Sequence, residues 1–238
     1  MGAWVEITAA DGHRLGAWRA EPQATPKGGL VVAQEMYGVN SYLMGVVDDY
    51  AAKGYLAIAP RLYDRLEPGL IIEYDDAGNR RAKELYRNYD WSKALLDLEA
   101  ARDAVADAGR VGILGFCFGG SLAWLAACRS DFACAVSYYG GEMTRYMDEG
   151  DHCPIECHVG DGDTALSPDK VAQFQARYPE VPFHVYPGAV HGFDNENRGA
   201  RHHPEATRLA RARTLEFLDA HIVGADGPSP APSPAGST

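Results

Sequence analysis

The sequence lacks the segments that would lead a chain out of the cell or anchor it in a membrane. No basic stretch followed by an apolar run opens the chain, so we expect no secretory signal. No apolar run is long enough to span a bilayer, so we expect no membrane partner. Basic residues are in deficit, 22 against 33 acidic ones, and the net charge is −11. Such a balance argues against nucleic acids as partners.

Cysteine is scarce, and its pattern excludes two further classes of protein. The five cysteines, an odd number, contain no Cys-x-x-Cys pair and match no spacing of metal ligands. We therefore expect reduced thiols, a cytoplasmic location, no metal and no cofactor. Cys128 and Cys134 are predicted to lie in the core.

The length and composition suit one globular unit, and no internal repeat is present. With 238 residues, 46% of them hydrophobic and 23% charged, the chain can bury a full core. We predict a single domain over residues 1–223, as a monomer or weak oligomer. From Gly224 the chain is rich in Pro, Ser and Gly, so residues 224–238 are predicted to be a disordered tail.

Short apolar runs alternate with helical patterns along most of the chain. Asp11-Gly12 is typical of a tight hairpin turn within residues 4–20. Continuous apolar strands separated by helices predict the α/β class, with a mostly parallel central sheet covered by helices on both faces. We expect strands at 30–34, 55–60, 111–116, 132–138, 155–159 and 183–186, and helices at about 40–54, from about 81 to 107, and 204–221.

The most informative stretch is Gly115-Phe-Cys117-Phe-Gly119, which follows an apolar run and precedes a helical pattern. Gly-x-nucleophile-x-Gly on a strand-to-helix turn is the nucleophile elbow, here with cysteine in the place of serine. The glycines leave room where a Cβ would clash, and the helix N-terminus favours a thiolate. The alternative is an ordinary tight turn with a buried structural cysteine.

A cysteine nucleophile needs a base and a group that orients the base. In this architecture the chain order is nucleophile, acid, histidine. His191 follows the last expected strand and is the predicted base. Asp161 and Asp163 both follow the strand before it, and we favour Asp163 because an apolar residue and a proline come soon after it. Both aspartates could instead cap turns.

The loop after the first parallel strand supplies a further group of candidates. Glu35 directly follows a buried run, which is unusual for a carboxylate and favours a site residue over an exposed loop residue. A loop at this place normally provides one oxyanion-hole amide, predicted to be that of Met36. The second is the amide of Phe118, after the nucleophile.

Taken together, these segments resemble the dienelactone hydrolase (carboxymethylenebutenolidase) family over about residues 1–222. The resemblance implies an α/β-hydrolase fold and a triad of Cys117, His191 and Asp163. It also implies that Glu35 contacts the resting thiol until substrate disturbs that contact. The matching segments are 34–40, 97–101, 115–120, 137–140, the loop around 163 and 191–193.

Members of that family hold a substrate carboxylate with two arginines. Arg80 and Arg81 lie near the first of these places, while Asn195 stands at the second, with Arg198 and Arg201 further along. Aromatic walls of the substrate site are predicted at three tyrosines, Tyr37, Tyr86 and Tyr138, for each of which ordinary packing is the alternative.

The leading hypothesis is a hydrolase of a small ester or lactone, acting through a thioester acyl-enzyme. Hydrolysis of other carboxylic esters is one alternative, and a non-catalytic, ligand-binding member of the fold is another. A redox or metal protein using its cysteines with His202 and His203 is the third.

Overall fold

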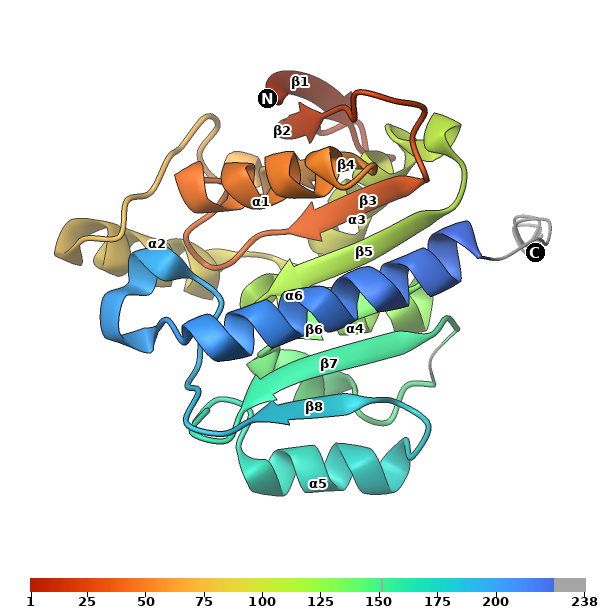
Figure 1. The fold of residues 1–238 in the computed structure, drawn as a ribbon. Helices are drawn as coiled ribbons and strands as arrows, with labels where there is room; N and C mark the ends of the chain where they lie inside the picture. The colour runs from red at the N-terminus through yellow and green to blue at the C-terminus, as the bar shows by residue number, and fades with distance from the viewer. Residues whose placement is uncertain (151, 225–238) are drawn as a thin grey trace, which may run out of the picture.

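Eight strands form one sheet in the computed structural model, which describes residues 1–150 and 152–224 (Figure 1). Their order across the sheet is β1-β2-β4-β3-β5-β6-β7-β8. The β1–β2 and β2–β4 pairs are antiparallel and every other pair is parallel, which confirms the predicted mostly parallel α/β sheet. The strands are β1 (Ala3–Thr8), β2 (Arg14–Ala20), β3 (Gly29–Ala33), β4 (Leu56–Pro60), β5 (Val111–Phe116), β6 (Ala135–Tyr138), β7 (Ile155–Gly160) and β8 (Phe183–Tyr186).

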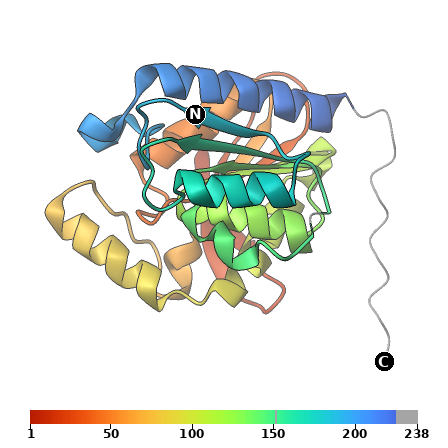
Figure 2. The same ribbon diagram turned by 90° about the horizontal axis from the view of Figure 1, so that it is seen from below.

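Helices cover both faces of this sheet, as predicted (Figures 1 and 2). One face packs against α1 (Ser41–Ala52) and α6 (Pro204–Leu218). The other packs against α3 (Trp91–Asp103), α4 (Phe118–Arg129) and α5 (Pro168–Arg177). The remaining helix, α2 (Asp76–Asn88), contributes Ala82 and Leu85 to that second cluster.

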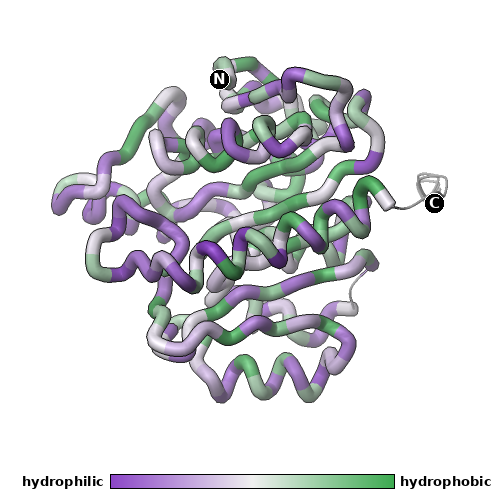
Figure 3. The backbone as a smooth tube through the Cα atoms, in the orientation of Figure 1, coloured by the Kyte–Doolittle hydropathy of each residue, from purple (hydrophilic) through white to green (hydrophobic). Residues whose placement is uncertain are grey.

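The central strands are apolar on both sides because both sides are covered. In β3, Leu30 and Val32 belong to the cluster under α1 and α6, whereas Val31 and Ala33 belong to the cluster under α3 and α4. Figure 3 shows this as a run of hydrophobic colour along the inner strands. The predicted burial of Cys128 and Cys134 is confirmed.

Three boundaries differ from the sequence-based predictions. The helix expected from about 81 to 107 is two helices, because Asp90 caps a new helix by accepting a hydrogen bond from the Ser92 amide (3.0 Å). The first of them begins earlier than predicted, at Asp76, after Asp75 caps it in the same way. The hairpin loop spans residues 9–13 rather than two residues. The predicted tail lies, beyond Gly224, outside the described residues.

The topology gathers four loops at one edge of the sheet. Because β3, β5, β7 and β8 run in the same direction, the loops that follow them leave from the same edge. In residues 1–150 and 152–224, none of the helices is both long and apolar enough to cross a bilayer.

Candidate active site

Cys117 occupies a strained position between β5 and α4. Its φ of 55° and ψ of −109° are values that L-residues rarely adopt, as expected for a nucleophile elbow. A Cβ on Gly115 would lie 2.0 Å from the Gly119 carbonyl oxygen, and one on Gly119 would lie 2.2 Å from the Ala33 carbonyl oxygen. The turn therefore requires glycine on both sides of the cysteine.

The thiol, the imidazole and a carboxylate form a continuous chain of hydrogen-bonding distances. His191 Nε2 lies 3.0 Å from Cys117 Sγ, and His191 Nδ1 lies 2.9 Å from Asp163 Oδ2. The second oxygen of Asp163, Oδ1, accepts hydrogen bonds from the amides of Ala165 (2.7 Å) and Leu166 (3.0 Å). This is the geometry of nucleophile, base and orienting acid.

Charge inside the site favours an imidazolium. Burial lowers the pKa of His191, but the neighbouring sulfur of Cys117 and the carboxylate of Asp163 outweigh it and raise that pKa to about 10. Burial likewise raises the pKa of Asp163, yet the His191 hydrogen bond and two backbone amides bring it below its usual value. These contacts favour the ionised form of Asp163 and the protonated form of His191.

Asp161, the other aspartate of this loop, lies elsewhere. It is exposed, and its Oδ1 accepts a hydrogen bond from the Gly188 amide (2.8 Å). It therefore braces the turn that leads to the His191 loop, and the imidazole contact belongs to Asp163.

A hydrogen bond joins the two segments that carry the amides predicted to form an oxyanion hole, those of Met36 and Phe118. The Gly119 amide donates to the Gln34 carbonyl at 2.9 Å, which joins the start of α4 to the loop after β3. Phe118 is the first residue of α4, where a backbone N–H has no partner inside the helix. Met36 lies half-buried, two residues after Gln34.

Glu35 is buried with its carboxylate held by two side chains from the loop after His191. Asn195 Nδ2 donates to Oε1 (2.8 Å), and an Arg198 nitrogen lies 3.4 Å from Oε2. Burial raises the pKa of Glu35, while Arg198 and Asn195 oppose that rise. The resemblance implied a contact between Glu35 and the resting thiol. In this structure the thiol instead faces His191.

Asn195, at one of the places where the resemblance implies an arginine, is fully buried. Its amide nitrogen bonds Glu35 and the Tyr74 hydroxyl (2.7 Å), and its oxygen accepts the Asn197 amide (2.9 Å). The structure thus places Asn195 as a holder of Glu35, behind the site, rather than as a group that faces substrate. This corrects its predicted role as a substrate-binding residue.

The three predicted tyrosines lie in different surroundings. Tyr86 packs edge-on against Phe118 with ring centroids 5.4 Å apart, and Tyr37 packs against Tyr74 at 4.6 Å. Burial raises the pKa values of both tyrosines, and the nearby sulfur of Cys117 adds to that rise. Tyr138 has no exposed surface and its hydroxyl bonds Thr214 of α6 (2.7 Å), so its predicted place in a substrate wall is wrong.

The two predicted arginines, Arg80 and Arg81, both lie on α2. Arg81 forms ion pairs with Glu67 and Glu84 on α2 and the loop before it, and Arg80 is exposed on the same helix. Binding of a substrate carboxylate by Arg81 would have to replace these ion pairs, and it stays a prediction. Arg198, from the loop after His191, places its guanidinium 5.0 Å from the Tyr37 ring centroid. In the sequence, the signal that could have identified Arg198 as a site residue was its position in the loop after His191.

Sequence reasoning also missed the group that anchors the His191 loop. Asp194 is buried and accepts two hydrogen bonds from Arg211 of α6, at 3.0 and 2.9 Å. The Tyr42 hydroxyl of α1 donates a third, at 2.6 Å. Asp194 therefore ties the loop that carries His191 and Asn195 to both helices of one face. Its nearness to His191 in sequence was the only clue.

Of the histidines named for a metal or redox site, His203 serves as a helix cap. Its Nδ1 accepts a hydrogen bond from the Ala206 amide at 3.2 Å, at the start of α6. Within the described ranges 1–150 and 152–224, no three side chains of His, Cys, Asp or Glu are grouped as metal ligands.

Comparison with known proteins accords with this geometry. The model of the dienelactone hydrolase family matches residues 15–222. Carboxymethylenebutenolidase of Pseudomonas putida is 32% identical over 225 residues, covering 90% of this chain and 94% of its own. Carboxymethylenebutenolidase 1 of Cupriavidus pinatubonensis is 30% identical over 224 residues, covering 90% and 95%. The crystal structure of a candidate dienelactone hydrolase from Klebsiella pneumoniae has a TM-score of 0.75 at 26% identity, covering 91% of this chain and 98% of that one. The family model covers nearly the whole described length of the chain, and the site holds a cysteine elbow, an Asp–His pair and a glutamate at the end of β3. This protein therefore belongs to the dienelactone hydrolase family.

Proposed function

We propose that the protein hydrolyses a small carboxylic ester or lactone through a thioester acyl-enzyme on Cys117. The observation that carries the proposal is the chain of contacts from Asp163 through His191 to the thiol, at 2.9 and 3.0 Å. The two relatives described above are named carboxymethylenebutenolidase, which supports ester or lactone hydrolysis as the reaction class.

In this mechanism the proton of the thiol resides on His191, and the thiolate attacks the carbonyl carbon of the substrate. The new C–S bond forms as the carbonyl oxygen becomes an anion, which the amides of Met36 and Phe118 stabilise. Collapse of that intermediate breaks the C–O bond, and His191 gives its proton to the leaving oxygen. Water, deprotonated by the same imidazole, then cleaves the thioester and restores the thiol.

We infer that Arg198 favours substrates that carry a carboxylate. Its guanidinium lies beside the Tyr37 ring, and its 3.4 Å separation from Glu35 leaves the pair loose enough to exchange for a substrate anion. The buried Glu35 would then be freed in the presence of such a substrate, which is how we account for the glutamate at this place.

The test of the catalytic proposal compares Cys117→Ala with the matched variant Cys128→Ala, which changes a buried cysteine outside the candidate active site. Release of p-nitrophenol from p-nitrophenyl acetate is expected to fall by about 10⁴-fold or more in the first and to stay near wild type in the second. Intact-mass spectra should show an acyl adduct that is absent from Cys117→Ala. A wild-type protein that is inert on esters and enol lactones would favour the ligand-binding alternative instead.

The inference about Arg198 is tested separately with Arg198→Gln. The kcat/KM for an anionic enol lactone should fall by about tenfold or more, and that for neutral p-nitrophenyl acetate should change little. An equal loss for both substrates would assign Arg198 a purely structural role.

A further inference from the structure

A cavity lies at the amino ends of the parallel strands, opposite the end that carries Cys117, where no part of the proposed reaction takes place. Its volume is about 310 Å³, and it opens between the ends of α3 and α4 and the start of β7. Val111, the first residue of β5, lines it, whereas Cys117 follows the last residue of that strand. At roughly 3.3 Å per residue, the two sites are about 20 Å apart. The cavity is therefore a site of its own, independent of the proposed function.

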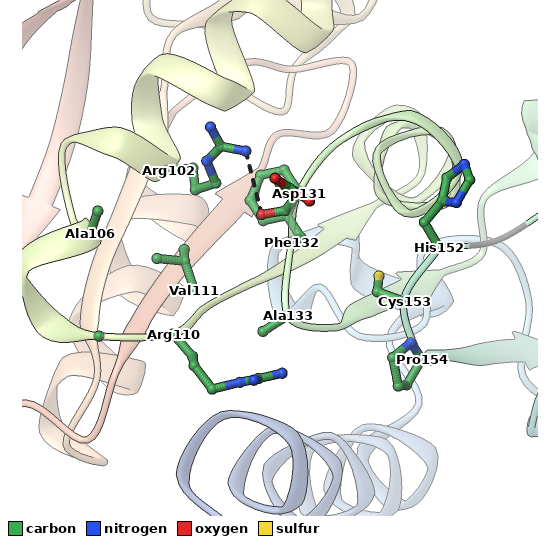
Figure 4. Close-up of a pocket in the computed structure, with 11 residues that line it drawn as sticks. Arg102, Ala106, Arg110, Val111, Asp131, Phe132, Ala133, His152, Cys153 and Pro154 are labelled. Atoms are coloured by element: carbon green, nitrogen blue, oxygen red, sulfur yellow. Dashed lines mark hydrogen bonds between the residues drawn. The ribbon is translucent and has the colours of Figure 1, made fainter. Parts of the chain in front are cut away.

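One wall of the cavity is apolar. Val111, Phe132, Ala133 and Cys153 supply carbon and sulfur surface, and Figure 4 shows Val111 and Ala133 between two arginines that enter from opposite sides. A cavity of this size with an apolar wall and a few polar groups matches the usual make-up of a small-molecule site.

The two arginines are not equivalent. The Arg102 guanidinium already has partners within the protein, since it donates hydrogen bonds to the Asp103 carboxylate (3.0 and 2.9 Å) and to the Asp131 carbonyl (3.4 Å). Among the described residues, Arg110 donates its Nε alone, to the His221 carbonyl at 3.1 Å. In the part of the chain that the structure describes, no carboxylate lies within ion-pair distance of Arg110, so its two terminal nitrogens remain for a ligand.

The charge of the cavity is therefore uneven. The exposed Asp131 stands near Arg102 (Figure 4), which leaves net positive charge only at the Arg110 end. On a protein with a net charge of −11, such a cation is a local exception that attracts anions. A guanidinium with two free nitrogens suits the planar, bidentate geometry of a carboxylate.

We propose that this cavity binds a small organic carboxylate. The carboxylate group contacts the terminal nitrogens of Arg110, and the apolar body of the ligand packs against Val111, Phe132 and Ala133. Asp131 repels the anionic group from the opposite end and so sets the orientation of the ligand.

Benzoate is a suitable probe because it combines one carboxylate with a small apolar ring. We expect saturable binding with a Kd of about 1 mM, as befits a ligand of this size. Backbone amide NMR signals of residues 109–111 and 132–133 should shift, while those of residues 115–119 at the elbow stay in place. Benzamide, which has the same shape without the charge, and inorganic phosphate, which has charge without the ring, should each bind at least about tenfold more weakly.

The matched variants are Arg110→Gln and Arg208→Gln, which remove the same charge from the cavity and from the exposed face of α6. Only the first should weaken benzoate binding, by about tenfold. Ala133→Leu, which fills the apolar wall and keeps Arg110, should also weaken it and covers the case in which Arg110→Gln does not fold. The proposal is overturned by shifts confined to the elbow, by equal affinity for benzamide, or by wild-type affinity in both cavity variants. Absence of saturable binding overturns it too.

Discussion

Replacing Asp163 by asparagine would test how the carboxylate controls the histidine. In the wild-type structure Oδ1 accepts two backbone N–H groups, from Ala165 and Leu166, and Oδ2 lies 2.9 Å from His191 Nδ1. Asparagine has one oxygen and one NH₂ group. Because two N–H donors already point at the Oδ1 position, the amide oxygen must stay there and the NH₂ must face His191.

That orientation forces the wrong tautomer. An NH₂ facing Nδ1 requires Nδ1 to be an acceptor, so the proton moves to Nε2, the nitrogen 3.0 Å from Cys117 Sγ. An Nε2–H cannot accept the proton of the thiol. Where this substitution has been made in comparable triads, turnover falls by about 10⁴-fold, which corresponds to roughly 5 kcal/mol of transition-state stabilisation.

The assay is hydrolysis of p-nitrophenyl acetate, with ¹⁵N NMR of the imidazole to identify the tautomer. Asp161→Asn is the matched control, because Asp161 is exposed and bonds only the Gly188 amide among the contacts described above. Its rate should stay within about threefold of wild type, as for most exposed substitutions away from special features. Equal losses for the two variants, or an unchanged tautomer in Asp163→Asn, would refute the reasoning.

Three further predictions concern the thiol and its surroundings. Glu35→Gln removes a buried negative charge that opposes the thiolate, so iodoacetamide should alkylate the free enzyme faster near neutral pH while turnover falls; superimposed pH–rate curves and unchanged turnover would leave Glu35 a structural residue. Cys117→Ala removes the largest contribution that raises the pKa of His191, so ¹³C NMR titration should show the imidazole losing its proton at a lower pH than in the wild type; an unchanged titration would contradict the coupling. Gly119→Ala would place a Cβ 2.2 Å from the Ala33 carbonyl oxygen, so urea unfolding should show a loss of about 2–3 kcal/mol, and a loss below about 0.5 kcal/mol would show that the turn relaxes.

The sequence was most informative where chemistry and backbone geometry demand the same residues. The Gly115 and Gly119 pair, the apolar runs and the order of nucleophile, acid and histidine each have a local physical cause, so the elbow and the sheet could be predicted. The preference for Asp163 over Asp161 rested on the residues that follow it, and it is Asp163 that accepts the hydrogen bond from His191 Nδ1.

Predictions failed where long-range contacts decide the role of a side chain. The side chain of Tyr138 points to the face of the sheet that α6 covers. Because both faces of the sheet are apolar, no local sequence pattern shows which face a given residue of the strand points to. The ion pair between Arg81 and Glu67 joins positions 14 apart in sequence, and no local pattern predicts it. Asp194 and Arg198 act through partners on α6 and at the end of β3, and such pairings follow from tertiary packing alone.

The positive φ at Cys117 has a consequence for how this protein would respond to selection for thermal stability alone. A backbone held there by a non-glycine residue stores about 1–3 kcal/mol of strain. Glycine would release it, at the expense of about 0.5–1 kcal/mol of added chain entropy in the unfolded state. At position 117, therefore, the residue that favours thermal stability differs from the residue that activity requires. A library screened for melting temperature without a turnover screen would be expected to enrich Cys117→Gly and discard the nucleophile.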